Sequence, residues 1–117
     1  MLENMNFEVA HIGINFPDSE AAGASAGEFL RLFGIKPQDG KDSVYSGPLL
    51  ELMKAPGRGA HGHIAIATSD ISAARAYLEG LGCVFDDSSA KYDSDGRMIV
   101  LYLTDEIAGF AVHLLQK

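Results

Sequence analysis

The chain has 117 residues, of which 47% are hydrophobic and 21% are charged, and its formal net charge at pH 7 is −7. The length and composition fit one globular domain and exclude a disordered chain. The negative charge and the lack of a basic run argue against nucleic acid or an anionic membrane as a partner. The single cysteine, Cys83, excludes an internal disulfide and favours the reducing cytoplasm.

Residues 7–16 predict a half-buried strand, because apolar and polar side chains alternate along them. The expected core face holds Ala10, Ile12, Ile14 and Phe16, and the opposite face holds Val9, His11, Gly13 and Asn15. Residues 17–19, Pro-Asp-Ser, end the strand and offer a helix cap. Apolar side chains at helical spacing then predict a helix over residues 22–33 that ends at Gly34.

Short strands are expected after this helix, at residues 42–46 and 48–54. Residues 35–37 are the weakest strand candidate, because Pro37 cannot donate a ladder hydrogen bond.

The second half of the chain follows the same plan. Its first strand has His63, Ala65 and Ala67 on one face and Ile64 and Ile66 on the other. Ser69-Asp70 can cap the next helix, whose apolar stripe consists of Ile71, Ala74, Leu78 and Leu81 and which is expected to end at Gly82. Further strands are expected at residues 84–92, 98–104 and 110–116.

Two stretches of sequence occur twice and indicate an internal repeat. Residues 10–14, AHIGI, return as residues 62–66, GHIAI, and residues 50–54, LELMK, resemble residues 112–117, VHLLQK. Each half therefore reads βαβββ, which predicts an α+β fold. Module one spans about residues 7–55, a flexible linker covers about residues 56–60, and module two spans about residues 61–117.

Each module carries one polar residue on its first strand and one on its last strand: His11 and Glu51 in module one, and His63 and His113 in module two. If the modules pack with pseudo-symmetry, these four side chains converge on one cavity. Three imidazoles and a carboxylate suit a divalent metal such as zinc, nickel, cobalt, manganese or iron. A lone histidine on a strand is usually a packing residue, so the prediction depends on the matched positions. His61 is expected to lie in a loop.

With these motifs the sequence resembles the vicinal oxygen chelate superfamily, which includes glyoxalase I, fosfomycin-resistance proteins, methylmalonyl-CoA epimerase and extradiol dioxygenases. The resemblance covers nearly the whole chain, from Phe7 to Lys117. It implies two βαβββ modules that form a U-shaped, half-barrel mixed sheet with the helices on the outside. It also implies a metal bound by His11 in AHIGI, Glu51 in LLELM, His63 in GHIAI and His113 in FAVHLL.

More narrowly, GHIAIAT, FDDSSAKYDSDG and DEIAGFAVHLLQK resemble the glyoxalase-like C-terminal domain of some bacterial 2-keto-3-deoxy-6-phosphogluconate/4-hydroxy-2-oxoglutarate aldolases. No aldolase barrel is present in this chain, so the aldolase's own chemistry does not transfer to it. One position departs from the wider family, because glyoxalase I, fosfomycin-resistance enzymes and dioxygenases place an acid where this chain has His113.

The leading interpretation is a glyoxalase-like isomerase or lyase that acts on a small 2-oxo or 2-hydroxy acid. Superfamily members hold an oxygenated substrate on the metal, which stabilises an enediolate or oxyanion. Glu51 is the only acid among the four ligands, and it is either a general base that detaches or a permanent ligand. The candidates for contacts with an anionic substrate are Lys54, Arg58, Lys91, Arg97 and Tyr102, each of which is also explained as a solvated or packing residue.

Three alternatives stay open on the sequence. One is a ligand-binding module like the bleomycin-resistance proteins, and another is a regulatory or dimerising domain that works with an aldolase. Iron-dependent extradiol cleavage is weaker, because a fourth protein ligand leaves fewer open positions for oxygen and substrate. A cytoplasmic homodimer is expected, with the metal site either inside one chain or shared between two.

Overall fold

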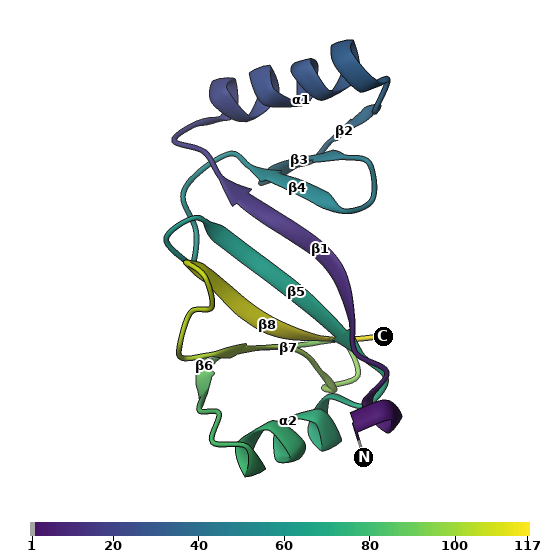
Figure 1. Ribbon diagram of the computed structural model, residues 1–117, viewed down its shortest axis with the longest axis vertical. Helices are drawn as coiled ribbons and strands as arrows, with labels where there is room; N and C mark the ends of the chain where they lie inside the picture. Colours follow the sequence, from purple (N-terminus) through teal and green to yellow (C-terminus); the bar gives the residue numbers. More distant parts are fainter. Residues whose placement is uncertain (1) are drawn as a thin grey trace.

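Both halves of the chain fold as β-α-β-β-β in the computed structural model, which describes residues 2–117 (Figure 1). After a 3-10 helix, η1 (Leu2–Met5), the first half contains β1 (Glu8–Asn15), α1 (Ser19–Phe33), β2 (Pro37–Asp39), β3 (Ser43–Ser46) and β4 (Leu50–Met53). The second half contains β5 (Gly62–Thr68), α2 (Ile71–Gly80), β6 (Phe85–Tyr92), β7 (Met98–Leu103) and β8 (Phe110–Gln116). The predicted α+β fold with two βαβββ modules is confirmed.

All eight strands form one mixed sheet in the order β2-β3-β4-β1-β5-β8-β7-β6. In each half the first and last strands are parallel neighbours, β1 with β4 and β5 with β8, and the halves join through the antiparallel pair β1 and β5. The strand order is therefore mirrored about the centre of the sheet. Figure 1 shows β1 and β5 in the middle and the two helices at opposite ends of the molecule.

Aspartate side chains begin both helices, as the sequence predicts. The Asp18 carboxylate accepts a hydrogen bond from the Ala21 amide at 2.8 Å, and Asp70 caps α2 in the same way. Gly34 ends α1 in the left-handed conformation that favours glycine. Gly82 ends α2 as predicted, because its positive φ lets the amides of Gly82 and Cys83 donate to the carbonyls of Glu79 and Leu78. The predicted apolar stripe is one residue too long, because the helix itself stops at Gly80 and Leu81 is 67% exposed.

Each helix covers its own outer part of the sheet with a separate apolar cluster. Ala22 and Ala26 of α1 pack with Val44 and Leu52 of β3 and β4. In the second half, α2 packs on β6, β7 and β8 through Ile71, Ala74, Phe85, Leu101 and Leu114. The alanines let the helix backbones approach the sheet closely. Among residues 2–117, no helix packs on the opposite face of the sheet, which is therefore available for a cavity.

A bulge in β1 changes which face its first residues occupy. His11 lies opposite Ala65 and Val9 lies opposite Ile66, so Ala10 is an extra residue in this strand. Directly opposed residues share a face, and Val9 therefore lies with Ile66 and not with His11. The predicted placement of Val9 beside His11 is wrong, because strict alternation cannot anticipate an inserted residue.

The weakest predicted strand lies two residues further along the chain than expected. The edge strand β2 begins at Pro37, where a missing backbone N–H is tolerated.

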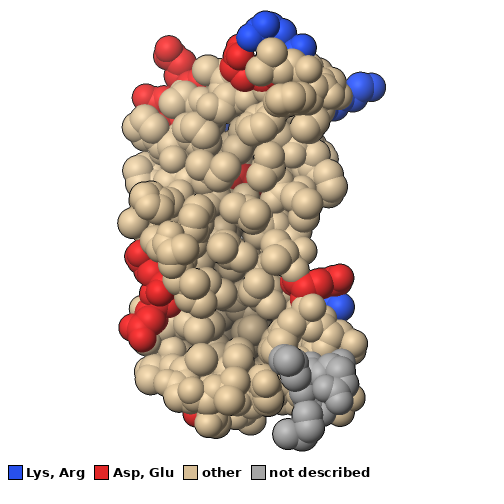
Figure 2. Space-filling model, viewed as in Figure 1, with Lys and Arg blue, Asp and Glu red and all other residues tan. Residues whose placement is uncertain are grey.

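The face of the molecule over β1 and β5 carries few charged side chains, which gather instead near the two ends and along the edges (Figure 2). Within residues 2–117, no helix combines the length and apolar character needed to cross a membrane.

Candidate metal centre

Two neighbouring rows of cross-strand partners bring the four matched residues to the helix-free face of the sheet. In one row Tyr45, Glu51, Gly13 and His63 follow one another across β3, β4, β1 and β5. In the other row His11, Ala65, His113 and Tyr102 follow one another across β1, β5, β8 and β7. In both rows a small residue separates two functional side chains, which leaves room for the rings to turn toward one another.

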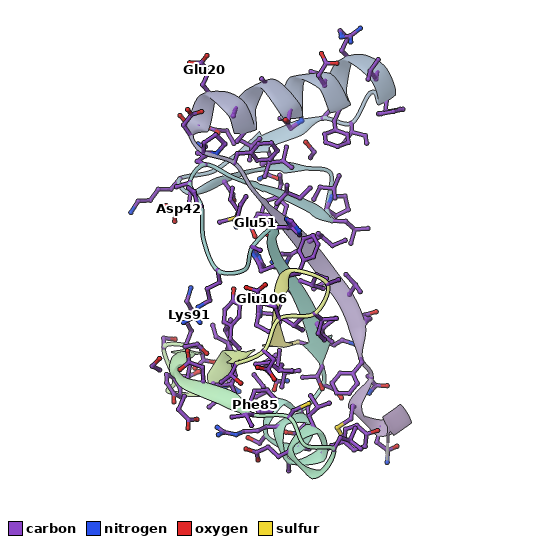
Figure 3. All side chains as sticks on the ribbon, turned by 60° about the vertical axis from the view of Figure 1, so that its left-hand side comes forward. Glu20, Asp42, Glu51, Phe85, Lys91 and Glu106 are labelled. Atoms are coloured by element: carbon purple, nitrogen blue, oxygen red, sulfur yellow. The ribbon has the colours of Figure 1, made fainter. Side chains whose placement is uncertain are left out.

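The four side chains meet closely. His11, His63 and His113 each offer a ring nitrogen, and these nitrogens lie within 4.8 Å of one another. Oε1 of Glu51 lies 3.0 Å from Nε2 of His63 and 3.4 Å from Nε2 of His11. Glu51 thus contacts two of the three imidazoles. Figure 3 shows Glu51 near the middle of the molecule, where the strands of the two halves meet.

Neighbouring groups fix the orientation of these side chains. The Ser43 hydroxyl donates to Oε2 of Glu51 at 2.8 Å, which leaves Oε1 to face the histidines. Nδ1 of His113 lies 2.9 Å from the Leu114 carbonyl, and it must carry the proton because a carbonyl only accepts. Nε2 of His113 therefore keeps its lone pair, which is the arrangement typical of a metal-binding histidine.

The surroundings favour neutral imidazoles beside an ionised carboxylate. Burial lowers the pKa of His113 from its ordinary 6.5 to about 4. Burial also lowers the pKa of His11, although the charge of Glu51 opposes this effect. The hydrogen bond from His63 lowers the pKa of Glu51. At neutral pH His11 and His113 therefore hold free lone pairs and Glu51 holds a negative charge, as metal ligands require.

The donor set fits a divalent cation. Zinc–nitrogen and zinc–oxygen bonds of about 2.0–2.2 Å place neighbouring ligand atoms roughly 3–4 Å apart. The distances of 3.0 and 3.4 Å from Glu51 fall in this range, and the histidine nitrogens need only small adjustments from separations within 4.8 Å. Three nitrogens and one oxygen also suit nickel, cobalt, manganese or iron, so the set does not select one metal.

Gly13 provides the space that the His63 ring occupies. A methyl group at this position would overlap the ring far inside van der Waals contact. We expect Gly13→Ala to displace the His63 ring and to weaken zinc binding by roughly 10–100-fold, as loss of a supporting contact does in other metal sites. Competition with a chromophoric chelator measures this affinity.

Gly27→Ala is the matched control for this substitution. Gly27 lies on the exposed side of α1 with no atom near its missing methyl group. The control should bind zinc like the wild type and raise the free energy of unfolding by about 0.5–1 kcal/mol. Equal zinc affinity in both variants would contradict the role assigned to Gly13.

The four residues form part of the lining of a cavity of about 590 Å³. Three of the candidate substrate residues, Arg58, Lys91 and Tyr102, also line it. Lys54 and Arg97 do not. Lys54 pairs with Asp39 at 2.8 Å, and Arg97 pairs with Asp93 and Asp95 at the β6–β7 turn, beside a different cavity. Acidic partners hold both cations outside the site, from the neighbouring turn for Arg97 and from the edge strand β2 for Lys54.

Sequence reasoning did not single out Ser43 or Gly13 for the site. Ser43 lies two residues before Tyr45 and so faces the same side of β3, which is a signal that strand alternation could have given. Gly13 lies on the face of His11, and a glycine inside a strand often marks the close approach of another group. The lining of the cavity also includes Asp42, Ser88 and Ser89.

Solved structures with the same fold support the architecture. No family model and no curated protein matches the sequence. The crystal structure of a hypothetical protein from Bacillus halodurans C-125 is 16% identical, with a TM-score of 0.67 over 95% of this chain and 94% of that one. A selenomethionyl methylmalonyl-CoA epimerase is 18% identical, with a TM-score of 0.62 over 92% of this chain and 93% of that one.

A third solved structure is the Streptomyces coelicolor methylmalonyl-CoA epimerase in complex with 2-nitronate-propionyl-CoA. It is 17% identical, with a TM-score of 0.61 over 93% of this chain and 96% of that chain. Identities this low establish a common architecture and leave activity open. The chain has the vicinal oxygen chelate fold, which it shares over more than nine-tenths of its length with these epimerase structures.

Proposed function

We propose that the chain is a metal-dependent isomerase that moves a proton next to the carbonyl of a small 2-oxo or 2-hydroxy acid. The observation that carries this proposal is the meeting of His11, His63, His113 and Glu51 in one cavity. Solved structures with this fold include epimerases, which are isomerases, and this favours isomerase over lyase chemistry.

Four side chains of the protein would hold the metal ion and set the charge of the site. His11, His63, His113 and Glu51 would hold the cation, and together they bring one negative charge. A divalent ion would therefore keep about one positive charge, which favours an anionic substrate. When bound, such an ion stabilises negative charge that develops on a carbonyl oxygen.

Glu51 is the residue proposed to take the proton. Its carboxylate is ionised at neutral pH, because the His63 hydrogen bond lowers its pKa. Ser43 holds one oxygen while the other faces the cavity interior, so a small rotation can present a free lone pair to a substrate carbon. Burial raises the pKa of the Tyr45 and Tyr102 hydroxyls further above neutral pH, so both stay protonated.

Metal content is the first test. Protein purified without a histidine tag, stripped with a chelator and reloaded with zinc, nickel, cobalt, manganese or iron should hold about one ion per chain by mass spectrometry. His63→Ala should lose this ion, whereas His61→Ala should keep it, because His61 lies outside the cluster and packs on Phe110. Retention of the metal by His63→Ala with an intact fold would contradict the site.

Proton exchange is the second test. In heavy water, metal-loaded protein should exchange the protons beside the carbonyl of 2-oxobutyrate or 2-oxoglutarate, as followed by proton NMR. Free metal at the same concentration and the His63→Ala protein set the background rate. A chain that holds the metal without any exchange above this background would be a ligand-binding or regulatory module, and the isomerase proposal would be wrong.

A further inference from the structure

The walls of the cavity carry opposite charges. Module one contributes two acids, Asp42 and Glu51. The linker and module two contribute two cations, Arg58 and Lys91. Figure 3 shows Asp42 in the upper half of the molecule and Lys91 in the lower half, both toward the left of the view. An anionic molecule in this cavity is therefore attracted toward the wall of module two and repelled from that of module one.

Arg58 comes from the linker between the modules and is held over that wall by two contacts. Its guanidinium lies 4.7 Å from the centre of the Tyr102 ring. It also donates to Asp86 at 3.3 Å through Nη1. Asp86 and Tyr102 are themselves cross-strand partners on β6 and β7. The arginine is thus positioned by the sheet, although its other nitrogens have no side-chain partner in the described part of the chain.

Lys91 is a cation without an acidic partner. It lines the cavity, and no carboxylate lies within 4.0 Å of its ammonium among the side chains that the structure describes from Asn4 onward. Lys91 shares this lining with His113, so its ammonium faces the cavity that holds the histidine cluster. Lys54 and Arg97, by contrast, are both paired with acids.

Tyr102 connects the arginine to the histidines. Its ring centre lies 4.7 Å from that of His113, with the two rings tilted by 48°, and 4.7 Å from the guanidinium carbon of Arg58. One wall of the cavity therefore has the candidate metal-binding histidines at one end, Tyr102 in between, and the cations Arg58 and Lys91 at the other end. A substrate that extends along this wall matches it best when it carries an anionic group at the end remote from its metal-binding oxygens.

We propose that Lys91 and Arg58 form an anion subsite for a second charged group of the substrate. This substrate class rests on the proposed function: it is a 2-oxo or 2-hydroxy acid that carries a further carboxylate or a phosphate at its other end. The ammonium of Lys91 and the free guanidinium nitrogens of Arg58 would each donate hydrogen bonds to that group.

Binding of simple anions tests the subsite without depending on catalysis. Succinate, phosphate and acetate are titrated into chelator-treated protein and into zinc-loaded protein, with amide shifts in proton–nitrogen NMR spectra as the readout. Succinate or phosphate should bind more tightly than acetate and shift the amides of Lys91 and Tyr102. The tighter of the two identifies the terminal group as a carboxylate or a phosphate.

Matched variants decide which cations are responsible. Lys91→Gln and Arg58→Gln should each weaken binding of the tighter anion about tenfold, the usual effect of losing one charge-assisted hydrogen bond. Lys54→Gln and Arg97→Gln remove the same charge outside the cavity and should leave the affinity unchanged. Equal weakening by all four variants would mean only general attraction, and the subsite would be wrong.

The chelator-treated arm separates this proposal from the proposed function. Anion binding that depends on Lys91 and Arg58 in metal-free protein supports the subsite, even if the histidine cluster fails to bind a metal. A chain that holds its metal and exchanges protons, but binds anions equally well in Lys91→Gln and wild-type protein, retains the function and lacks the subsite. Absence of binding by all three anions in both forms also overturns the subsite.

Discussion

Replacement of Glu51 by glutamine is expected to slow proton exchange into 2-oxobutyrate or 2-oxoglutarate by about 10²–10⁴-fold in metal-loaded protein, the usual effect of losing a general base. The amide has nearly the same shape as the carboxylate and can still accept the Ser43 hydrogen bond. It cannot take a proton at neutral pH. The variant therefore removes the proposed chemistry while keeping the packing of the site.

Asp42→Asn is the control for this experiment, because Asp42 is the other carboxylate of the cavity and contacts none of the histidines. It should exchange protons at close to the wild-type rate. Metal content is measured for both variants, so that loss of the ion is separated from loss of the base. A Glu51→Gln protein that keeps its metal and its exchange rate would show that Glu51 is not the base.

The internal repeat made much of the fold predictable. A strand has a side-chain period of two, so AHIGI and GHIAI fix the faces of β1 and β5 from His11 and His63 onward. Capping aspartates and apolar spacing likewise fix where both helices begin. These signals are local, and the structure departs from them mainly where the chain is irregular, as at the Ala10 bulge and at Leu81, which follows the last residue of α2.

The cationic wall could not be predicted from local pattern. Arg58 belongs to a linker that reads as a flexible connector, and its position depends on Tyr102 and Asp86, which are far along the sequence. Lys54 follows Glu51 closely, yet Asp39 draws it away from the cavity. The position of a long charged side chain is set by its partners in space, and a sequence does not give those partners.

Some expectations depend on facts that a single chain does not carry. Imidazole and carboxylate ligands accept several divalent metals, so the identity of the ion depends on availability and geometry. The cytoplasmic location, the homodimer and the association with an aldolase stay predictions, because the structure of one chain does not show its location or its partners. Size-exclusion chromatography with light scattering, with and without an aldolase, measures the last two directly.

Metal-free protein is expected to lose about 3 kcal/mol of its free energy of unfolding between pH 6.5 and about pH 4. The reason is His113, which is 5% exposed and whose pKa burial lowers from 6.5 to about 4. In this window the unfolded chain binds a proton at His113 and the folded chain does not. Acid therefore favours the unfolded state, and the stability is fully present above pH 6.5.

Urea unfolding at a series of pH values measures this slope. His11 acts in the same direction, because burial also lowers its pKa, whereas the lowered pKa of Glu51 moves its contribution below pH 4.5. His113→Gln keeps a polar side chain that cannot titrate, so its stability should change much less between pH 6.5 and pH 4. His61→Gln, in an exposed loop, should keep the wild-type slope. If His113→Gln showed the same dependence of unfolding free energy on pH as the wild type, His113 would not be held neutral in the folded chain. The argument that its Nε2 keeps a lone pair for a metal would then be wrong.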